Sequence, residues 1–187
     1  MKRLLTAALV AAFPVAALPA PAQDQPHRFA DFPDAAIVYY DVTGTSDAEI
    51  RRAMNAARPT SSSGERHDAL TTWRFGVAVR PGGSGTCEVR VHVETQVIFP
   101  RLAAETRLRK NQMAGWNSYV TALEEHEAGH LARAYAVPAT FAAPLEWDCG
   151  AAREHARAVI EQAGASQVAY DDATAHGRKT GAIFPRP

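Results

Sequence analysis

The sequence of 187 residues has only two cysteines, no excess of either charge and, after its first residues, no long apolar run. Lysine plus arginine equals aspartate plus glutamate, at 20 each. This balance, without a long run of one sign, gives no indication of a surface for nucleic acid or anionic membranes. No segment beyond the N-terminal one is long and apolar enough to span a bilayer. The remaining length suits a single domain able to bury a proper core.

The N-terminus has the layout of a secretory signal peptide. Lys2 and Arg3 precede an alanine-rich apolar run that ends in Ala-Pro-Ala at residues 20–22, an A-x-A cleavage site. An uncleaved membrane anchor is the alternative, but the prolines in this run are unfavourable in a long membrane-spanning helix. We therefore predict a signal peptide over residues 1–22, a single mature domain over residues 23–187, and a secreted or periplasmic protein with no membrane attachment after cleavage.

Cys87 and Cys149 are the two cysteines. In an exported protein an even pair is typical of a disulfide. As zinc ligands they would need C-x-x-C-like proximity or further cysteines, and the sequence has neither. We predict a disulfide between them.

The first half of the mature chain reads mainly as strands. Residues 36–42 are rich in Ile, Val and Tyr, and Ser46 can cap a helix over residues 47–57. Large apolar side chains then alternate with polar ones in residues 71–79 and again in 87–97. A glycine-rich turn joins these two runs, which predicts an antiparallel hairpin with one wet face.

The second half reads as helices. A proline-free stretch over residues 113–136 predicts one helix, and Pro138 supplies a stop or kink soon after it. A short apolar connection over residues 141–148 leads to a second helix over about 151–162. Strands followed by helices define the α+β class.

Five residues of the first of these helices, 126 to 130, spell H-E-x-x-H. Two histidines four apart on a helix project from one face, so both imidazoles can reach a single metal ion. The glutamate between them, Glu127, is placed to take a proton from a metal-activated water. The pattern points to zinc chemistry only if the segment is a helix that turns this face inward.

The residues around the motif fit such a helix. His126, Glu127 and His130 fall within or beside its apolar face, where an unpaired polar group is costly and a metal would satisfy it. That face consists of Trp116, Val120, Leu123, Leu131 and Ala134. Gly129 lies on the opposite side, and close passage of another backbone there is one explanation for a glycine inside a helix.

A catalytic zinc site needs a third protein ligand. The extended motif H-E-x-x-H-x-x-G-x-x-H is excluded because Arg133 and Ala136 stand where Gly and His would be required. Glu154 on the following helix lies opposite the apolar stripe of that helix, which favours a solvated position. His176 lies in a polar segment, 170–177, that reads as irregular, and its spacing alone leaves open whether it is a ligand or a tail residue without a role.

Several segments together resemble a bacterial family described as predicted secreted zinc-dependent proteases (domain of unknown function 922). The resemblance covers most of the mature chain: the Trp73 and Cys87 strands, Trp116 with the H-E-x-x-H helix, Cys149, and the terminal Tyr170-Asp171, Thr174, His176-Gly177 and Gly181. It implies a zincin-like fold, a small antiparallel sheet packed on the H-E-x-x-H helix with a helical C-terminal part. It also favours His176 as the third metal ligand.

The expected function is zinc-dependent hydrolysis of peptide bonds in a peptide or protein substrate. His126, His130 and His176 would hold Zn²⁺, and Glu127 would act as general base. An oxyanion donor is also needed, and Tyr170 is a candidate, although core packing would also explain it.

His155 is a second candidate for that donor. Two other functions fit the same motif: a zinc hydrolase acting on cell-wall amides or esters, or a non-catalytic exported domain that binds zinc or a partner. Glu127 argues against the last, because a purely structural zinc site does not need a base.

Overall fold

The computed structural model describes residues 27–81, 86–141 and 148–184, so the predicted signal peptide lies outside the described residues. The elements follow in the order η1 (His27–Asp31), β1 (Ala36–Val42), α1 (Asp47–Ala57), β2 (Leu70–Pro81), β3 (Cys87–Leu102), α2 (Lys110–Thr140), α3 (Cys149–Thr174) and η3 (Arg178–Thr180). The chain is therefore α+β, as its sequence predicts. None of the helices in these ranges is both long and apolar enough to cross a membrane.

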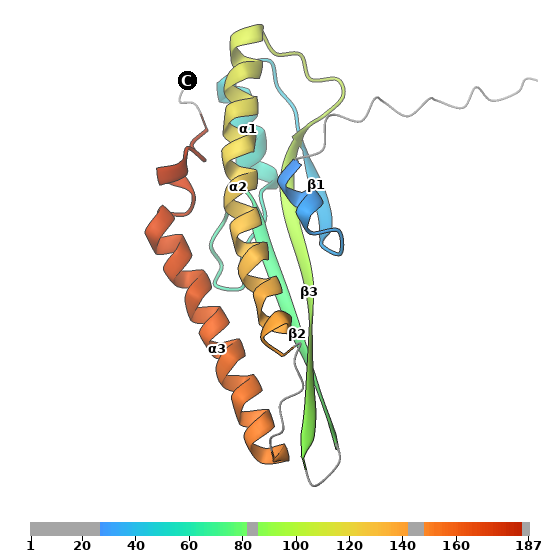
Figure 1. The fold of residues 1–187 in the computed structure, drawn as a ribbon. Coiled ribbons are helices and arrows are strands. Elements are labelled where there is room, and N and C mark those ends of the chain that lie inside the picture. The colour runs from blue at the N-terminus through green and yellow to red at the C-terminus, as the bar shows by residue number, and fades with distance from the viewer. Residues whose placement is uncertain (1–26, 82–85, 142–147, 185–187) are drawn as a thin grey trace, which may run out of the picture.

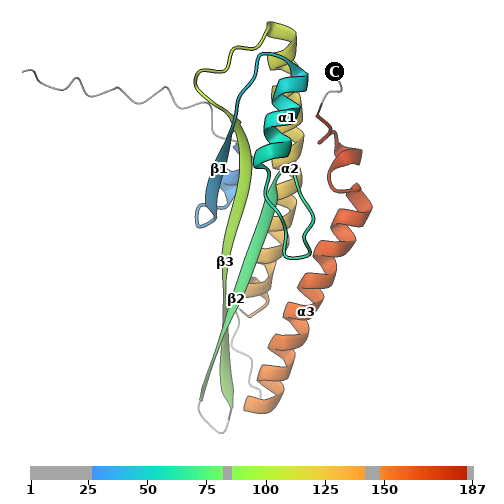
Figure 2. The ribbon, with the colours of Figure 1, turned by 180° about the vertical axis from the view of Figure 1, so that it is seen from behind.

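The three strands form one sheet in the order β1-β3-β2, seen from behind in Figure 2. β2 and β3 are antiparallel, with Thr71 opposite Val97, as the two alternating runs and the glycine-rich sequence between them predict. β1 runs parallel to β3, with Ile37 opposite Val97, so the sheet is mixed and not antiparallel as expected. Alternation determines which face of a strand is buried but carries no information on the direction of its neighbour.

β3 is longer than predicted because its two halves have different partners. Residues 87–98 of β3 pair with β2, and residues 96–102 pair with β1, which carries the strand on to Leu102. This second half contributes Val97, Phe99 and Leu102 to the main core, where Phe99 packs edge-on against Phe29 at 5.3 Å. The main core thus lies where β1, β3, α1 and α2 meet.

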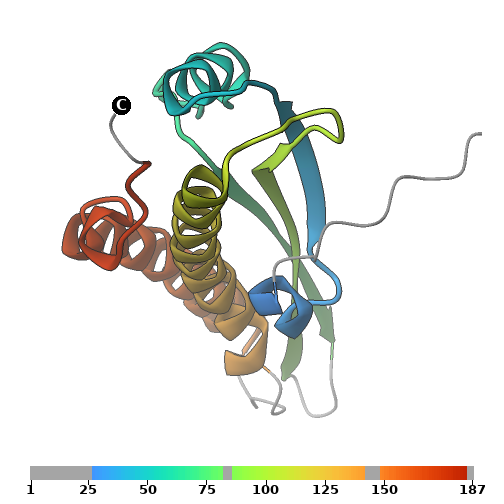
Figure 3. The ribbon, with the colours of Figure 1, turned by 90° about the horizontal axis from the view of Figure 1, so that it is seen from above.

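The long helix α2 packs along the sheet, and α3 follows it on the side away from β1 (Figures 1 and 3). α2 extends beyond the predicted 113–136 at both ends. Pro138 lies inside its last turn, and the helix ends two residues later at Thr140. The predicted stop is thus found within one turn of the proline, because a ring without an N–H group cannot continue the hydrogen-bond ladder.

α3 differs most from prediction. It begins at Cys149 and continues to Thr174, and the carboxylate of its N-cap residue, Asp148, accepts hydrogen bonds from the Gly150 and Ala151 N–H groups at 2.8 and 3.1 Å. Residues 170–174, expected to be irregular, are therefore its last helical turn. Gly164 costs about 1 kcal/mol in a helix interior, but contacts of α3 with α2 and the hairpin outweigh this local preference.

The predicted disulfide between Cys87 and Cys149 is confirmed, with Cα atoms 5.0 Å apart. It joins the start of β3 to the start of α3. Around it lies a second apolar cluster, in which Val89 and Phe141 pack with Ala152 and Ala156 of α3. The first half of α3 is therefore held to the hairpin, and the second half extends along α2.

Candidate metal centre

The H-E-x-x-H residues of α2 are buried. His126, Glu127 and His130 are 5%, 4% and 7% exposed. A helix rotates by about 100° per residue, which brings positions four apart to the same face. That face is turned toward α3, and the rings of His126 and His130 lie edge to face with centroids 4.8 Å apart.

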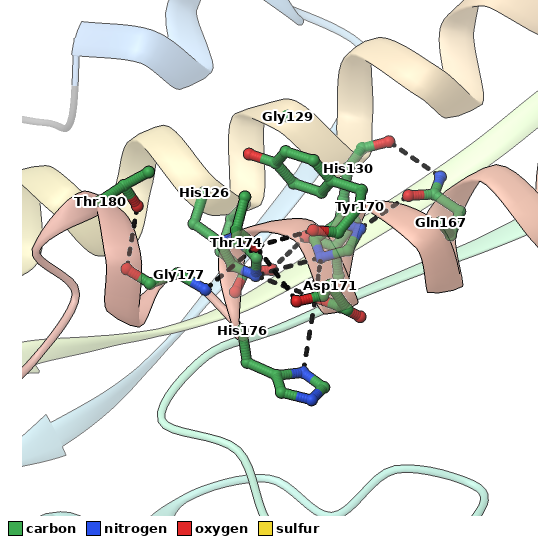
Figure 4. A network of polar contacts seen from close by, with 12 residues as sticks. His126, Gly129, His130, Gln167, Tyr170, Asp171, Thr174, His176, Gly177 and Thr180 are labelled. Carbon is green, nitrogen blue, oxygen red and sulfur yellow. Dashed lines mark hydrogen bonds and ion pairs between the residues drawn. The ribbon is translucent and has the colours of Figure 1, made fainter.

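Asp171 of α3 completes a group of three ligand atoms between the helices (Figure 4). The Nε2 atoms of His126 and His130 are 3.2 Å apart. Oδ1 of Asp171 lies 3.2 Å from Nε2 of His126 and 3.1 Å from Nε2 of His130. Within the described residues this is the one group of three or more side chains with metal-ligating geometry.

Gln167, one helical turn before Asp171, determines which nitrogen of His130 carries a proton. Its amide nitrogen donates to the carbonyl oxygen of His130 at 3.1 Å, because that oxygen can only accept. Its Oε1 then faces Nδ1 of His130 at 2.6 Å, so Nδ1 is the donor. In a neutral ring the other nitrogen, Nε2, therefore presents a lone pair to the cluster.

His126 is oriented in the same way by Thr174. The Thr174 hydroxyl donates to the carbonyl oxygen of Tyr170 at 2.8 Å, which leaves it as an acceptor for Nδ1 of His126 at 3.4 Å. Nε2 of His126 is then also an acceptor. Partners that hold Nδ1–H and leave Nε2 free are the usual outer contacts of metal-binding histidines.

With both rings neutral, three acceptor atoms converge on one point, which is unfavourable unless a proton or a metal ion lies between them. Zinc bonds of about 2.0–2.1 Å in a tetrahedron place ligand atoms about 3.3 Å from one another. The three separations of 3.1 to 3.2 Å match this spacing. The donor set therefore fits a divalent metal ion such as zinc.

The electrostatics of the cluster also favour a cation. Burial acts to lower the pKa of His130, but its contacts with Asp171, Glu127 and Gln167 outweigh this and raise it. Burial acts to raise the pKa of Asp171, but hydrogen bonds with His126 and His130 outweigh this and lower it well below the usual range. Asp171 is therefore ionised at neutral pH, as a metal ligand must be.

Glu127 is oriented by β2. The Thr71 hydroxyl donates to Oε2 of Glu127 at 2.6 Å, and Thr71 is itself only 6% exposed. This bond is made by Oε2 and not by Oε1, and both residues line the cavity. A buried carboxylate with one fixed and one available oxygen is suited to accept a proton.

His176, the predicted third ligand, lies at the edge of the cluster. Its Nδ1 is 3.5 Å from Oδ1 of Asp171, and its side chain is 60% exposed. Ala175 and His176 both have left-handed backbone, with φ of 50° and 54°. Two such residues in succession are strained. This left-handed conformation reverses the chain after α3 and brings the His176 ring beside Asp171.

Tyr170, a predicted catalytic residue, packs beside the cluster and is not among the residues that line the cavity. Its ring stacks on His126 at 5.1 Å and 14°, and its hydroxyl points to Gly129 of α2 (Figure 4). A Cβ atom at Gly129 would overlap that hydroxyl and ring. The close approach that explains Gly129 is therefore a tyrosine side chain, not a second backbone. Arg133 covers the other face of the ring at 3.7 Å from its centre.

The other residues considered for the site lie away from it. His155, a candidate oxyanion donor, is near the start of α3, where its ring packs edge-on against Phe141 at 5.5 Å. Glu154 beside it is exposed, as its place opposite the apolar stripe predicts. Glu154 and His155 lie near the start of α3, whereas Asp171 lies near its other end.

The cluster opens into a cavity of about 840 Å³. One wall is the segment 58–69, which is anchored by Asp68. The Asp68 carboxylate accepts hydrogen bonds from Arg51 at 2.9 Å, Arg58 at 3.0 Å and the Tyr119 hydroxyl at 2.7 Å. These bonds outweigh the effect of burial and lower the pKa of Asp68. His67, the neighbour of Asp68, faces His176 across the cavity, with ring centroids 6.4 Å apart.

Sequence reasoning assigned no role to four residues of the centre: Thr71, Gln167, Asp171 and Thr174. A helical pattern extended through residue 174 would have placed Gln167, Asp171 and Thr174 on one face, three and four apart. The contact of Thr71 with Glu127 spans 56 positions, and no local pattern indicates it.

Fold and site together define an α+β protein with two histidines and an aspartate clustered between two helices, in a geometry that could hold a metal ion. A family of bacterial proteins of unknown function, DUF922, matches residues 37–177, and the chain belongs to this family. This agrees with the family suggested by its sequence motifs. No curated protein and no solved structure matches the chain.

Proposed function

We propose that this protein is an exported zinc-dependent peptidase with a zincin-like active site. The observation that carries the proposal is the convergence of two imidazole Nε2 atoms and one carboxylate oxygen on a single point at the spacing of zinc ligands. Glu127 lies next to this point and faces the cavity. The Cys87–Cys149 disulfide fits an oxidising compartment outside the cytosol.

His126, His130 and Asp171 are the proposed ligands, and a zinc ion held there supplies a Lewis acid that acidifies water and polarises a carbonyl. Gln167 and Thr174 hold the two rings so that their Nε2 atoms point at the metal position.

Glu127 takes the proton of the attacking water through Oε1 and transfers it to the leaving amine. Thr71 keeps the carboxylate in place during both transfers. A donor is also needed for the developing oxyanion. Because the Tyr170 hydroxyl is directed to Gly129 and His155 is remote, His67 and His176 are the better-placed donors on the cavity wall.

The third ligand is the part of the site where sequence and geometry differ. The family resemblance favours His176, whereas the distances favour Asp171, with His176 in contact with it. We expect Asp171→Ala to weaken zinc binding severely and His176→Ala to keep the metal but reduce turnover. Zinc affinity measured by competition with a chelator separates the two: loss of zinc only in His176→Ala would make His176 the third ligand.

Elemental analysis of the purified mature protein, with digestion assays on denatured proteins and on cell-wall fragments, tests the function itself. We expect about one zinc per chain, lost in His126→Ala, and proteolysis that disappears in Glu127→Gln while the zinc remains. Wild-type protein without zinc after careful metal supplementation would refute the metal site. Cleavage of cell-wall fragments alone would replace the peptidase assignment with a different zinc hydrolase.

A further inference from the structure

The cavity at the metal centre has two chemically different ends. At one end His67 faces His176, whose Nδ1 is 3.5 Å from Asp171. At the other end Trp73 of β2 lies nearly parallel to the His130 ring, at 17° and 6.5 Å between centroids. His67 thus contacts His176, which contacts Asp171, and Trp73 contacts His130. The ligand atoms therefore lie between a polar end of the cavity and an end that contains a large aromatic side chain.

Val168 of α3 is a further apolar residue that lines the cavity. It follows Gln167, which is bonded to His130, and it is 62% exposed. The other large apolar side chains that are exposed in the described residues, Val38, Val77 and Ile183, do not line the cavity. Val168 contributes little to the core, so its apolar surface is available to a ligand in the cavity.

We propose that Trp73 and Val168 form a subsite for a bulky apolar side chain of a peptide, next to the metal cluster. The assignment of a peptide rests on the proposed function. Binding of such a side chain removes apolar surface from water on both partners, and a tryptophan ring loses little conformational freedom when it is covered. Ligand cavities typically combine such an apolar wall with a few polar groups that orient the ligand.

The two ends also give the bound peptide a direction. An apolar side chain at Trp73 and Val168 places the neighbouring backbone at the cluster, where Glu127 and the ligand atoms face the cavity. The chain then continues toward His67 and His176, which offer imidazole groups to polar atoms. A substrate with the opposite arrangement would bury a polar side chain against Trp73 and leave it without partners.

Binding is measured on the mature zinc-supplemented Glu127→Gln variant, so that turnover does not interfere. The probes are fluorescein-labelled, blocked pentapeptides Ala-Ala-X-Ala-Ala, with X as Phe, Leu, Ala or Asp, followed by fluorescence anisotropy. We expect the Phe and Leu peptides to bind about tenfold more tightly than the Asp peptide, the effect of partly burying one large side chain. Adding Val168→Asn should reduce this preference at least about threefold.

Val77→Asn is the matched control, because Val77 is also an exposed valine, at 44%, but lies outside the cavity. The subsite is refuted if no peptide binds, if the Phe and Asp peptides bind equally, or if both asparagine variants behave alike. Cleavage of the same peptides by wild-type protein separates this inference from the function. Selective binding without cleavage would refute the peptidase and support the subsite. Cleavage without a preference for apolar side chains would support the peptidase and refute the subsite.

Discussion

Replacing Thr71 with valine tests whether the hydrogen bond from β2 to Glu127 supports both stability and turnover. Valine keeps the shape of the side chain and removes the hydroxyl that lies 2.6 Å from Oε2 of Glu127. Both residues are more than nine-tenths buried, so water cannot replace this donor freely. A hydrogen bond to a charged group contributes about 1.5–3 kcal/mol, so we expect the free energy of unfolding to fall by about 2 kcal/mol. For a domain of this size that lowers the melting temperature by about 4–8 °C.

The same substitution frees the carboxylate to rotate, so we expect kcat to fall at least about tenfold with little change in KM or zinc content. Thr71→Ser keeps the hydroxyl and is the matched control, expected to retain most of the activity. Thermal unfolding, zinc analysis and steady-state peptide hydrolysis measure these effects. Wild-type kcat in Thr71→Val, or equal losses in the serine and valine variants, would show that the hydrogen bond does not position the base.

Four further outcomes are expected. Replacing Cys87 and Cys149 with serine should lower the free energy of unfolding by about 4 kcal/mol, measured with denaturant, because the bridge closes a loop of 62 positions; no difference from reduced wild type is the internal check. A change of glycine to alanine in a helix interior ordinarily gains about 1 kcal/mol. Gly129→Ala should instead destabilise the protein, because Tyr170 fills the space that the new methyl group needs; higher thermal stability would contradict this packing. The lowered pKa of Asp68 means that its contribution is full above its ordinary pKa of 3.8 and is lost as pH falls through the lower folded value. Asp68→Asn should therefore flatten the pH dependence of unfolding on the acid side. Removal of zinc with a chelator should increase hydrogen exchange in the second half of α3 more than in the first, which the disulfide holds; uniform protection would argue against metal-linked docking.

The sequence by itself determined those features that depend on local pattern. Ser46 at the start of α1 accepts a hydrogen bond from the Glu49 N–H at 3.3 Å, as capping predicts. The alternation in β2 and β3 defined two half-buried strands, and the glycine-rich sequence between them predicted the hairpin. His126 and His130 could be placed on one inward face because helix geometry brings positions four apart together.

The tertiary structure decided what depends on contacts between distant segments. The parallel pairing of β1 with β3 leaves no local signature, and the length of α3 is set by its packing on α2. Because that helix continues to Thr174, Asp171 meets His126 and His130, whereas a helix ending near residue 162 left His176 as the main candidate. The Thr71 hydroxyl reaches Glu127 only when β2 lies against α2. Local propensity determines which element forms, but the free energy of burial and of long-range polar contacts determines where it ends and what it meets.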